Sequence, residues 1–238
     1  VLVLAIGTSA WAGNTQVAVA ANFAAPMKRI AQQFSQDTGH TATLVFGATG
    51  QLFANIQHGA PFDVLLAADQ HTPQALVQSG LAVAQSRFTY ATGRLALWSA
   101  QPNLSLGPDT LKSGNFKRLA VASPALAPYG LAAQQTLASL GISVAAQSRI
   151  VQGSSVTQAF QFVATGNADI GFVAVSQIMA NGQIERGSAW LVPAALHAPI
   201  RQDAVLLQRA TGNEAASALM QYMRSAPAQS TLRAFGYE

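Results

Sequence analysis

Four short turns carry the residues of this sequence that could do chemistry. They span residues 20–23 (Ala-Ala-Asn-Phe), 46–50 (Phe-Gly-Ala-Thr-Gly), 127–130 (Ala-Pro-Tyr-Gly) and 152–156 (Gln-Gly-Ser-Ser-Val). Each follows a short apolar run and precedes a helical pattern, so each places free backbone N–H groups at the start of a helix. Those groups, together with the positive end of the helix dipole, favour an anion.

The side chains in these turns strengthen the prediction of an anion site. Asn22, Thr49, Ser154 and Ser155 add hydrogen-bond donors, and none of the turns contains Asp, Glu, Lys or Arg. Any one of these polar residues could instead cap its own helix. Their recurrence after several strands favours a ligand, because ligands of open α/β folds bind beyond the carboxyl ends of the strands.

Other kinds of chemistry find little support. The chain has no cysteine, which excludes disulfides and thiolate metal sites. Asp63 and Asp69 flank an apolar run, and we interpret Asp69 as a turn or cap residue. Isolated serines such as Ser99 have no base partner in a recognisable motif. The histidines show no metal-ligand spacing; they are His40, His58, His71 and His197.

The elements that must position these turns alternate along the chain. Apolar runs predict strands at 16–20, 41–46, 64–67, 95–98, 119–122, 149–152, 170–173 and 205–208. Helical spacing predicts helices at 25–36, 51–58, 74–79, 130–140, 156–165, 215–225 and 230–235. Alternation of this kind is typical of a parallel α/β sheet.

The repeated pattern predicts two α/β lobes joined by two crossing strands. The chain has 238 residues, enough for two domains of roughly 100 residues each. We expect crossing strands near 90–99 and 200–209. Lobe I then comprises residues 13–93 plus 203–238, lobe II comprises 94–202, and the final helix packs on lobe I.

Composition narrows the class of partner. Half of the residues are hydrophobic and 9% are charged, with a net charge of +4. No basic run carries interleaved aromatic residues, so nucleic-acid binding is not expected. We expect a soluble monomer without a cofactor.

The first twelve residues predict export. An apolar run ends in Ala10-Trp11-Ala12, which is typical of the latter half of a secretory signal peptide. We expect cleavage after Ala12 and treat 1–12 as the remnant of a signal. A buried first strand is the alternative for this segment.

Several motifs together resemble the periplasmic molybdate-binding proteins of ABC importers. They include 19–23 (Val-Ala-Ala-Asn-Phe), 46–52 (Phe-Gly-Ala-Thr-Gly-Gln-Leu), 59–64 (Gly-Ala-Pro-Phe-Asp-Val) and 67–69 (Ala-Ala-Asp). The turn at 128–130, the run 170–173 (Ile-Gly-Phe-Val) and the closing 235–237 (Phe-Gly-Tyr) also fit. The resemblance covers residues 16 to 237.

The resemblance implies a type II periplasmic binding fold with an oxyanion between two lobes. It implies that the ligand is molybdate or tungstate, that the protein is periplasmic, and that its partner is the membrane permease of an ABC importer. By position, the implied ligand contacts are Asn22, Thr49, Tyr129, Val156 and Ala174. Thr49 stands where serine is common in the family, and Ala174 where some members place tyrosine.

The chemistry of the turns agrees with this assignment. Molybdate is fully ionised at neutral pH and only accepts hydrogen bonds, so its site should present donors and no carboxylate. Three alternatives stay open: a binding protein for sulfate or another tetrahedral oxyanion, an exported hydrolase, and the effector domain of a transcription regulator. The last would require DNA-binding helices, which the sequence does not show.

Overall fold

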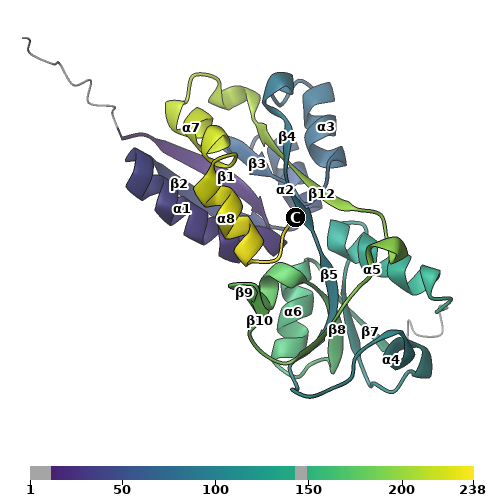
Figure 1. Cartoon of the computed structure of the whole chain (residues 1–238). Coiled ribbons are helices and arrows are strands. Elements are labelled where there is room, and N and C mark those ends of the chain that lie inside the picture. The colour runs from purple at the N-terminus through teal and green to yellow at the C-terminus, as the bar shows by residue number, and fades with distance from the viewer. Residues whose placement is uncertain (1–11, 143–148) are drawn as a thin grey trace, which may run out of the picture.

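Two lobes form the molecule, and each is built around a five-stranded sheet (Figure 1). The computed structural model describes residues 12–142 and 149–238. The predicted signal segment lies outside the described residues apart from Ala12, so its fate stays a prediction.

The sheet of lobe I has the strand order β2-β1-β3-β12-β4. Its strands are β1 (Asn14–Ala20), β2 (Thr41–Gly47), β3 (Val64–Leu66), β4 (Phe88–Gly93) and β12 (Ile200–Leu206). Strands β2 and β3 both run parallel to β1, while β12 runs antiparallel to β3 and β4. The sheet is therefore mixed rather than purely parallel, because β12 is a returning crossing strand and not part of a strand–helix–strand repeat.

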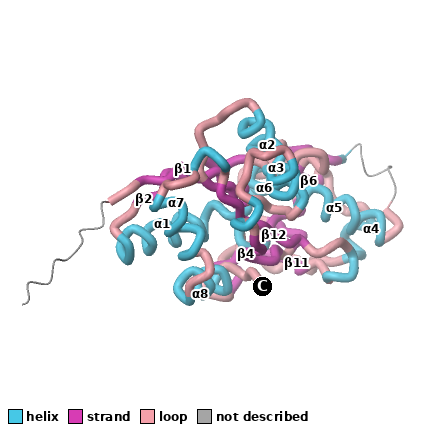
Figure 2. The backbone as a smooth tube through the Cα atoms, turned by 90° about the horizontal axis from the view of Figure 1, so that it is seen from above, coloured by secondary structure: helices cyan, strands magenta, loops and turns pink. Residues whose placement is uncertain are grey.

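Helices cover both faces of this sheet, as Figure 2 shows from above. On one face, Val17, Val19 and Leu66 pack with residues of α1 (Ala24–Thr38), α7 (Glu214–Tyr222) and α8 (Ala226–Ala234). On the other face, Ala18 and Leu65 pack with α2 (Thr49–Gln57) and α3 (His71–Gln78). Both faces are buried because side chains alternate between them along each strand. The predicted packing of the final helix on lobe I is confirmed.

The sheet of lobe II has the order β11-β5-β8-β6-β7. Its strands are β5 (Leu95–Ser99), β6 (Leu119–Ala122), β7 (Ile150–Gly153), β8 (Ile170–Ala174) and β11 (Ser188–Leu191). Its helices are α4 (Pro108–Ser113), α5 (Pro128–Ser139) and α6 (Val156–Ala164), and β9 (Met179–Ala180) pairs with β10 (Gln183–Ile184). Here β6 runs parallel to β7 and β8, while β5 runs antiparallel to β8 and to β11.

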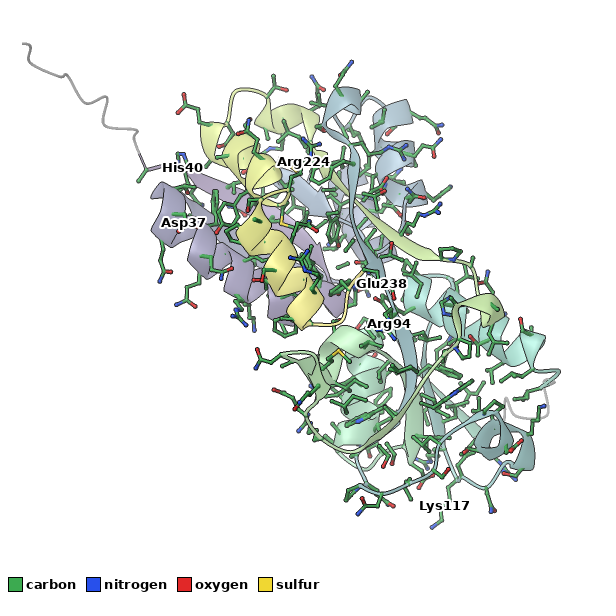
Figure 3. The ribbon with its side chains drawn as sticks, viewed as in Figure 1. Asp37, His40, Arg94, Lys117, Arg224 and Glu238 are labelled. Carbon is green, nitrogen blue, oxygen red and sulfur yellow. The ribbon has the colours of Figure 1, made fainter. Side chains whose placement is uncertain are left out.

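The crossing between the lobes is made by β4 with β5 and by β12, near the predicted positions. Arg94 is the one residue between β4 and β5. The chain end pairs with this crossing: the Thr92 N–H donates to the Glu238 carbonyl at 2.7 Å, and the Glu238 N–H donates to Thr92 at 3.1 Å. The side chains of Arg94 and Glu238 also form an ion pair of 3.6 Å between the lobes (Figure 3). The residue boundaries of the lobes stay a prediction.

Candidate functional site

A small cavity lies where helix starts from the two lobes meet. Its volume is about 10 Å³, roughly the space that one water molecule needs. All four predicted turns contribute to it. Its lining residues are Ala20, Ala21, Asn22, Ala48, Thr49, Ala68, Ala127, Pro128, Tyr129, Ser155 and Val156. The turns that the sequence singled out are thus brought together across both lobes.

Backbone N–H groups without partners surround this cavity. Thr49 is the first residue of α2, Val156 the first of α6 and Tyr129 the second of α5. N–H groups in the first turn of a helix have no acceptor within that helix. Among the described residues, no other group accepts a hydrogen bond from these three N–H groups. The cavity therefore faces the positive ends of three helix dipoles.

Thr49 has a hydroxyl hydrogen that it can donate. Its Oγ1 atom accepts a hydrogen bond of 3.1 Å from the Ala68 N–H. This bond links the segment after β2 to the segment after β3. The capping position of α2 is Ala48, and no side chain caps that helix. Thr49 is therefore not a helix cap, and its hydroxyl hydrogen is available to an acceptor in the cavity.

Ser155 lines the cavity but is a helix cap. Its Oγ accepts from the Gln158 N–H at 3.2 Å, as the capping position of α6 requires. The sequence placed Ser155 in a donor turn without including it among the ligand contacts. Its hydroxyl hydrogen has no acceptor among the described residues, so it adds one more candidate donor.

Asn22 faces the cavity with a side chain that is already hydrogen-bonded. It lies in the 3-10 turn η1 (Ala21–Phe23) after β1 and does not cap it. Its Nδ2 donates to Gln202 Oε1 at 3.0 Å and to the Tyr237 hydroxyl at 2.9 Å. Both amide hydrogens thus have internal acceptors.

These contacts belong to a buried polar network beneath the cavity. Gln202 is fully buried, accepts from the Tyr90 hydroxyl at 2.9 Å, and donates from Nε2 to the Tyr129 hydroxyl at 3.1 Å. Tyr237 donates to the Asn22 carbonyl at 3.0 Å. Burial raises the pKa of Tyr90 and of Tyr129 well above 10, and raises the pKa of Tyr237 to about 12. All three hydroxyls therefore keep their protons at neutral pH, and the network carries no charge.

A β-bulge brings Tyr90 and Gln202 together. Gln202 of β12 pairs with Ala91 of β4, but the next residue, Asp203, pairs with Thr89. Tyr90 is therefore an extra, unpaired residue in β4. Bulges of this kind redirect side chains and are frequent beside functional sites. The Tyr90 hydroxyl lies within hydrogen-bond distance of the Ala67 carbonyl, at 3.0 Å, and of Gln202, at 2.9 Å, and its one hydrogen is shared between these two neighbours.

Ala174 is not part of the cavity. It ends β8, is fully buried, and is absent from the lining. Its N–H donates to Gln177 Oε1 at 3.0 Å, so the backbone donor that the resemblance would require already has an acceptor. We do not carry Ala174 into the proposed ligand contacts.

No charged residue lines the cavity. Asp69 lies in an adjoining groove of about 220 Å³ that shares Ala68 and Pro128 with it. The Asp69 carboxylate accepts from the Thr72 N–H at 2.7 Å, which confirms the predicted turn or cap role, and burial raises its pKa. Asp63 forms an ion pair of 3.0 Å with Arg209. Neither carboxylate is placed to contact an ion in the cavity.

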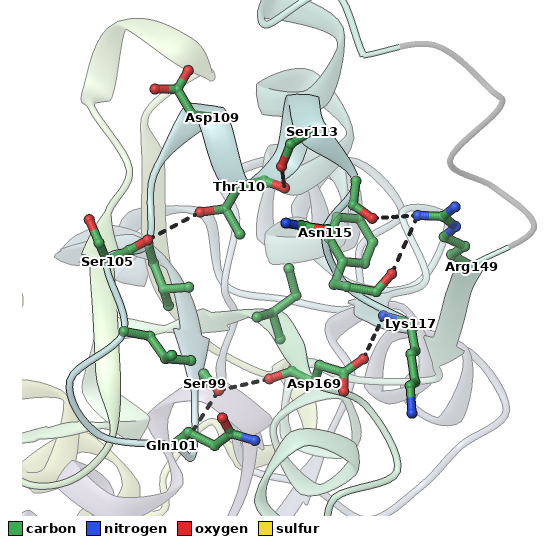
Figure 4. A pocket seen from close by; sticks show the side chains of 15 residues that line it. Ser99, Gln101, Ser105, Asp109, Thr110, Ser113, Asn115, Lys117, Arg149 and Asp169 are labelled. Atoms are coloured by element: carbon green, nitrogen blue, oxygen red, sulfur yellow. Dashed lines mark hydrogen bonds between the residues drawn. The ribbon is translucent and has the colours of Figure 1, made fainter.

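A much larger depression lies elsewhere in lobe II (Figure 4). It has a volume of about 1010 Å³. Two of its charged groups serve the local fold: the Asp169 carboxylate accepts from the N–H groups of Lys117 and Arg118 at 2.8 Å each, and Arg149 donates to the Gly114 carbonyl. Because its lining also includes the carboxylates of Asp109 and Asp169, the depression is a weaker candidate for binding an anion than the small cavity.

The described residues contain neither a metal-binding cluster nor a membrane-spanning helix. Across 12–142 and 149–238, no three His, Asp or Glu side chains gather in a way that could hold a metal ion. No helix in that part of the chain is both long and apolar enough to cross a bilayer.

Comparison with known proteins places this arrangement among solute-binding proteins. Residues 15–238 match the family described as bacterial extracellular solute-binding protein. The chain is 51% identical to the molybdate-binding protein ModA of Azotobacter vinelandii, over 99% of this chain and 96% of that protein. It is 42% identical to the ModA of Rhodobacter capsulatus, over 99% of this chain and 92% of that protein.

Solved structures of solute-binding proteins also resemble this chain. The Azotobacter vinelandii periplasmic molybdate-binding protein superposes with a TM-score of 0.90 at 38% identity, covering 94% of this chain and 98% of that one. The sulfate-binding protein SubI of Mycobacterium tuberculosis superposes with a TM-score of 0.76 at 13% identity, covering 94% of this chain and 86% of that one. The second likeness shows the fold alone.

Proposed function

The chain belongs to the family of bacterial extracellular solute-binding proteins, and we propose that it captures molybdate in the cavity between its lobes. The family and the named relatives are binding proteins, so this chain is a binding protein and not an enzyme. The exported hydrolase is therefore excluded.

The observation that carries the proposal is the convergence of donors without any carboxylate or cation. The N–H groups of Thr49, Tyr129 and Val156 and the Thr49 hydroxyl face one cavity with no charged lining. Molybdate accepts hydrogen bonds at all four oxygens and donates none. Hydrogen bonds to a charged partner contribute roughly 1.5–3 kcal/mol each, so a few of them suffice for tight binding without a counter-charge.

The choice of molybdate among oxyanions rests on the relatives. The fold does not decide it, because a sulfate-binding protein shares the fold at low identity. Two proteins named for molybdate binding share 51% and 42% of their residues with this chain over nearly its whole length. Tungstate has the same charge and shape, and we propose it as a second ligand.

The cellular context follows from the same proposal. The protein is exported through the predicted signal segment, acts in the periplasm as a monomer, and delivers the anion to the membrane permease of an ABC importer. The cavity of about 10 Å³ is smaller than an oxyanion of five heavy atoms. The two lobes therefore move slightly apart to admit the anion and close around it.

A thermal-shift panel tests the ligand assignment. The purified protein is heated with sodium molybdate, tungstate, sulfate or phosphate at matched ionic strength. A ligand at a hundred times its Kd adds ~2.7 kcal/mol, which corresponds to roughly 5–10 °C for a chain of this size. We expect such shifts with molybdate and tungstate and much smaller ones with sulfate and phosphate. Equal shifts with sulfate would remove the molybdate assignment, and no shift with any of the four would remove the oxyanion site.

A further inference from the structure

The main-chain carbonyl of Asn22 lacks the donor that an α-helix would give it. Asn22 lies in η1, directly before α1, and the residue four positions on is Pro26, which has no N–H. Asn22 is only 3% exposed. A buried carbonyl without a donor destabilises the fold, so this one depends on groups from elsewhere in the chain.

Two hydroxyls supply that donor, one from each lobe. The Ser176 hydroxyl donates to the Asn22 carbonyl at 2.7 Å. Ser176 lies in the 3-10 turn η4 (Val175–Gln177), which follows β8 of lobe II. The Tyr237 hydroxyl lies 3.0 Å from the same carbonyl and 3.1 Å from the Ser176 oxygen, and its one hydrogen is shared between them. Because a carbonyl only accepts, the Ser176 hydrogen must point to it.

Tyr237 belongs to lobe I, whereas Ser176 belongs to lobe II. The Tyr237 ring packs in the core of lobe I with its centroid 5.6 Å from that of Phe23, and the next residue, Glu238, pairs with β4. When the lobes separate, Tyr237 therefore stays beside Asn22 and Ser176 moves away. The bond from Ser176 forms only when the lobes close.

These bonds hold the Asn22 carbonyl on the side away from the cavity. Asn22 lines the cavity, but neither Ser176 nor Tyr237 does. The Thr157 hydroxyl of lobe II holds the preceding carbonyl, that of Ala21, in the same way at 3.1 Å. The orientation matters because a carbonyl oxygen turned towards an oxyanion repels it. Without Ser176, the Asn22 carbonyl in the closed form keeps only the shared hydrogen of Tyr237.

We infer that Ser176 is a positioning residue for the anion site, which on closure fixes the Asn22 turn with its carbonyl away from the ligand, and that Tyr237 is its counterpart in lobe I. The inference rests on the proposed function. It gives lobe II a second role beside supplying the N–H donors of Tyr129 and Val156, since lobe II also shapes the half of the site in lobe I.

A matched pair of serine variants tests the inference. Ser176→Ala removes the bond that forms on closure and leaves Tyr237 in place. Ser99→Ala is the control, because Ser99 is also buried and its hydroxyl donates to a main-chain carbonyl, that of Asp169, at 2.8 Å, but within lobe II. The release of radiolabelled molybdate into an excess of unlabelled molybdate gives the dissociation rate. Calorimetry gives Kd, and the association rate follows from the two.

We expect Ser176→Ala to release molybdate about fivefold faster than the unaltered protein, with association changed by less than about twofold. Ser99→Ala should leave both rates within about twofold. The chase follows only bound molybdate, so a sample that is partly unfolded still yields the rate of its folded fraction.

A double-mutant cycle adds a signature that a purely structural hydroxyl would not give. Either hydroxyl can serve the Asn22 carbonyl alone, but Tyr237→Phe together with Ser176→Ala leaves it without both. The double variant should therefore release molybdate at least about fivefold faster than the product of the two single effects predicts.

Three outcomes overturn the inference. They are release from Ser176→Ala at the rate of the unaltered protein, an equal increase in Ser99→Ala, and a double variant whose effect equals the product of the single effects. If the unaltered protein retains no radiolabelled molybdate, the proposed function itself has failed and the inference fails with it.

Discussion

At the scale of single residues, a helix-capping side chain and an anion-binding side chain use the same groups, and the structure separates them. Ser155 accepts from an N–H of its own helix, which is the cap contact. Thr49 accepts from Ala68 in the next connection instead. Asn22 makes no contact with the N–H groups of its own turn. The capping alternative therefore holds for Ser155 and fails for Thr49 and Asn22.

Removing either of these two side chains should weaken molybdate binding. Thr49→Ala deletes a donor to an ion that can only accept, and such a bond contributes roughly 1.5–3 kcal/mol. Asn22→Ala removes the side chain that joins the cavity to Gln202 and Tyr237 in the buried network. We expect each Kd to rise about ten- to a hundredfold. Titration calorimetry beside melting curves of the free protein measures affinity and stability separately.

Two controls distinguish this loss from general damage. Thr49→Ser keeps the hydroxyl and should bind within about threefold of the unaltered protein. Ser225→Ala removes the cap of α8, in lobe I away from the cavity, and should cost ~1 kcal/mol of stability with unchanged affinity. Affinities that stay unchanged in both Asn22→Ala and Thr49→Ala would show that the half of the site in lobe I is elsewhere.

The buried tyrosines predict how stability depends on alkaline pH. The pKa of Tyr237 is raised from 10 to about 12, so between these values the folded protein holds a proton that the unfolded chain has lost. The stabilisation is fully present below pH 10 and is lost as pH rises through 12. Each such group contributes a slope of about 1.4 kcal/mol per pH unit in that window. Urea unfolding from pH 9 upwards should show a smaller slope in Tyr237→Phe, and an identical slope would contradict the shift.

At the scale of elements, the sequence predicted most of the fold because its strands and helices are short and clearly patterned. The apolar spacing of α1, for example, buries Met27, Ile30 and Phe34, and Gly39 ends the helix with a positive φ of 76°. The apolar run at 205–208 marks only the end of β12, which begins at Ile200 where the crossing strand was expected, since Gln202 and Asp203 are buried polar residues that break the apolar pattern. The antiparallel pairing of the crossing strands likewise has no local signature.

The site, too, could be predicted from the sequence only where its residues have a local signature. Helix starts after strands have a local signature, so the turns with Asn22, Thr49, Tyr129 and Val156 could be found from the sequence, and the structure brings them to one cavity. Gln202 could not be found, because its role depends on a bulge and on partners far apart in the chain. The resemblance pointed to Tyr237 without indicating its contact with Asn22.

The end of β4 should be intolerant of any side chain. Gly93 has an ordinary backbone conformation, but a Cβ there would overlap the Tyr129 hydroxyl and Gln202 Nε2. Gly93→Ala should therefore lower the free energy of unfolding by roughly 1–3 kcal/mol and weaken molybdate binding. Gly107→Ala is the control, because its Cβ would meet open space in extended backbone; it should change stability by less than about 0.5 kcal/mol. Equal effects in the two variants would contradict the crowding at Gly93.

At the scale of the whole molecule, a small number of direct hydrogen bonds hold the two lobes against each other beside the cavity. The Gly50 N–H donates to the Leu126 carbonyl at 3.0 Å, and the Thr157 hydroxyl donates to the Ala21 carbonyl at 3.1 Å. A ligand whose donors come from both lobes adds further bonds across the same boundary. Closure and binding are therefore coupled, and each interlobe bond should affect how long the anion stays bound.

Thr157→Val tests this coupling without altering the lining of the cavity. Valine has the shape of threonine and lacks the hydroxyl, so the bond to Ala21 is lost, together with the bond of 3.3 Å that the same oxygen accepts from Gln177 within lobe II. A neutral hydrogen bond contributes about 1 kcal/mol, so molybdate should dissociate about fivefold faster in stopped-flow displacement by tungstate, with little change in association. Thr165→Val, at the residue that follows α6, is the control, because that hydroxyl donates within lobe II to the Gln161 carbonyl and accepts from Asn167. If both variants release molybdate at the rate of the unaltered protein, the bond between Thr157 and Ala21 does not hold the closed form, and closure depends on the other contacts between the lobes, such as that of Gly50 with Leu126.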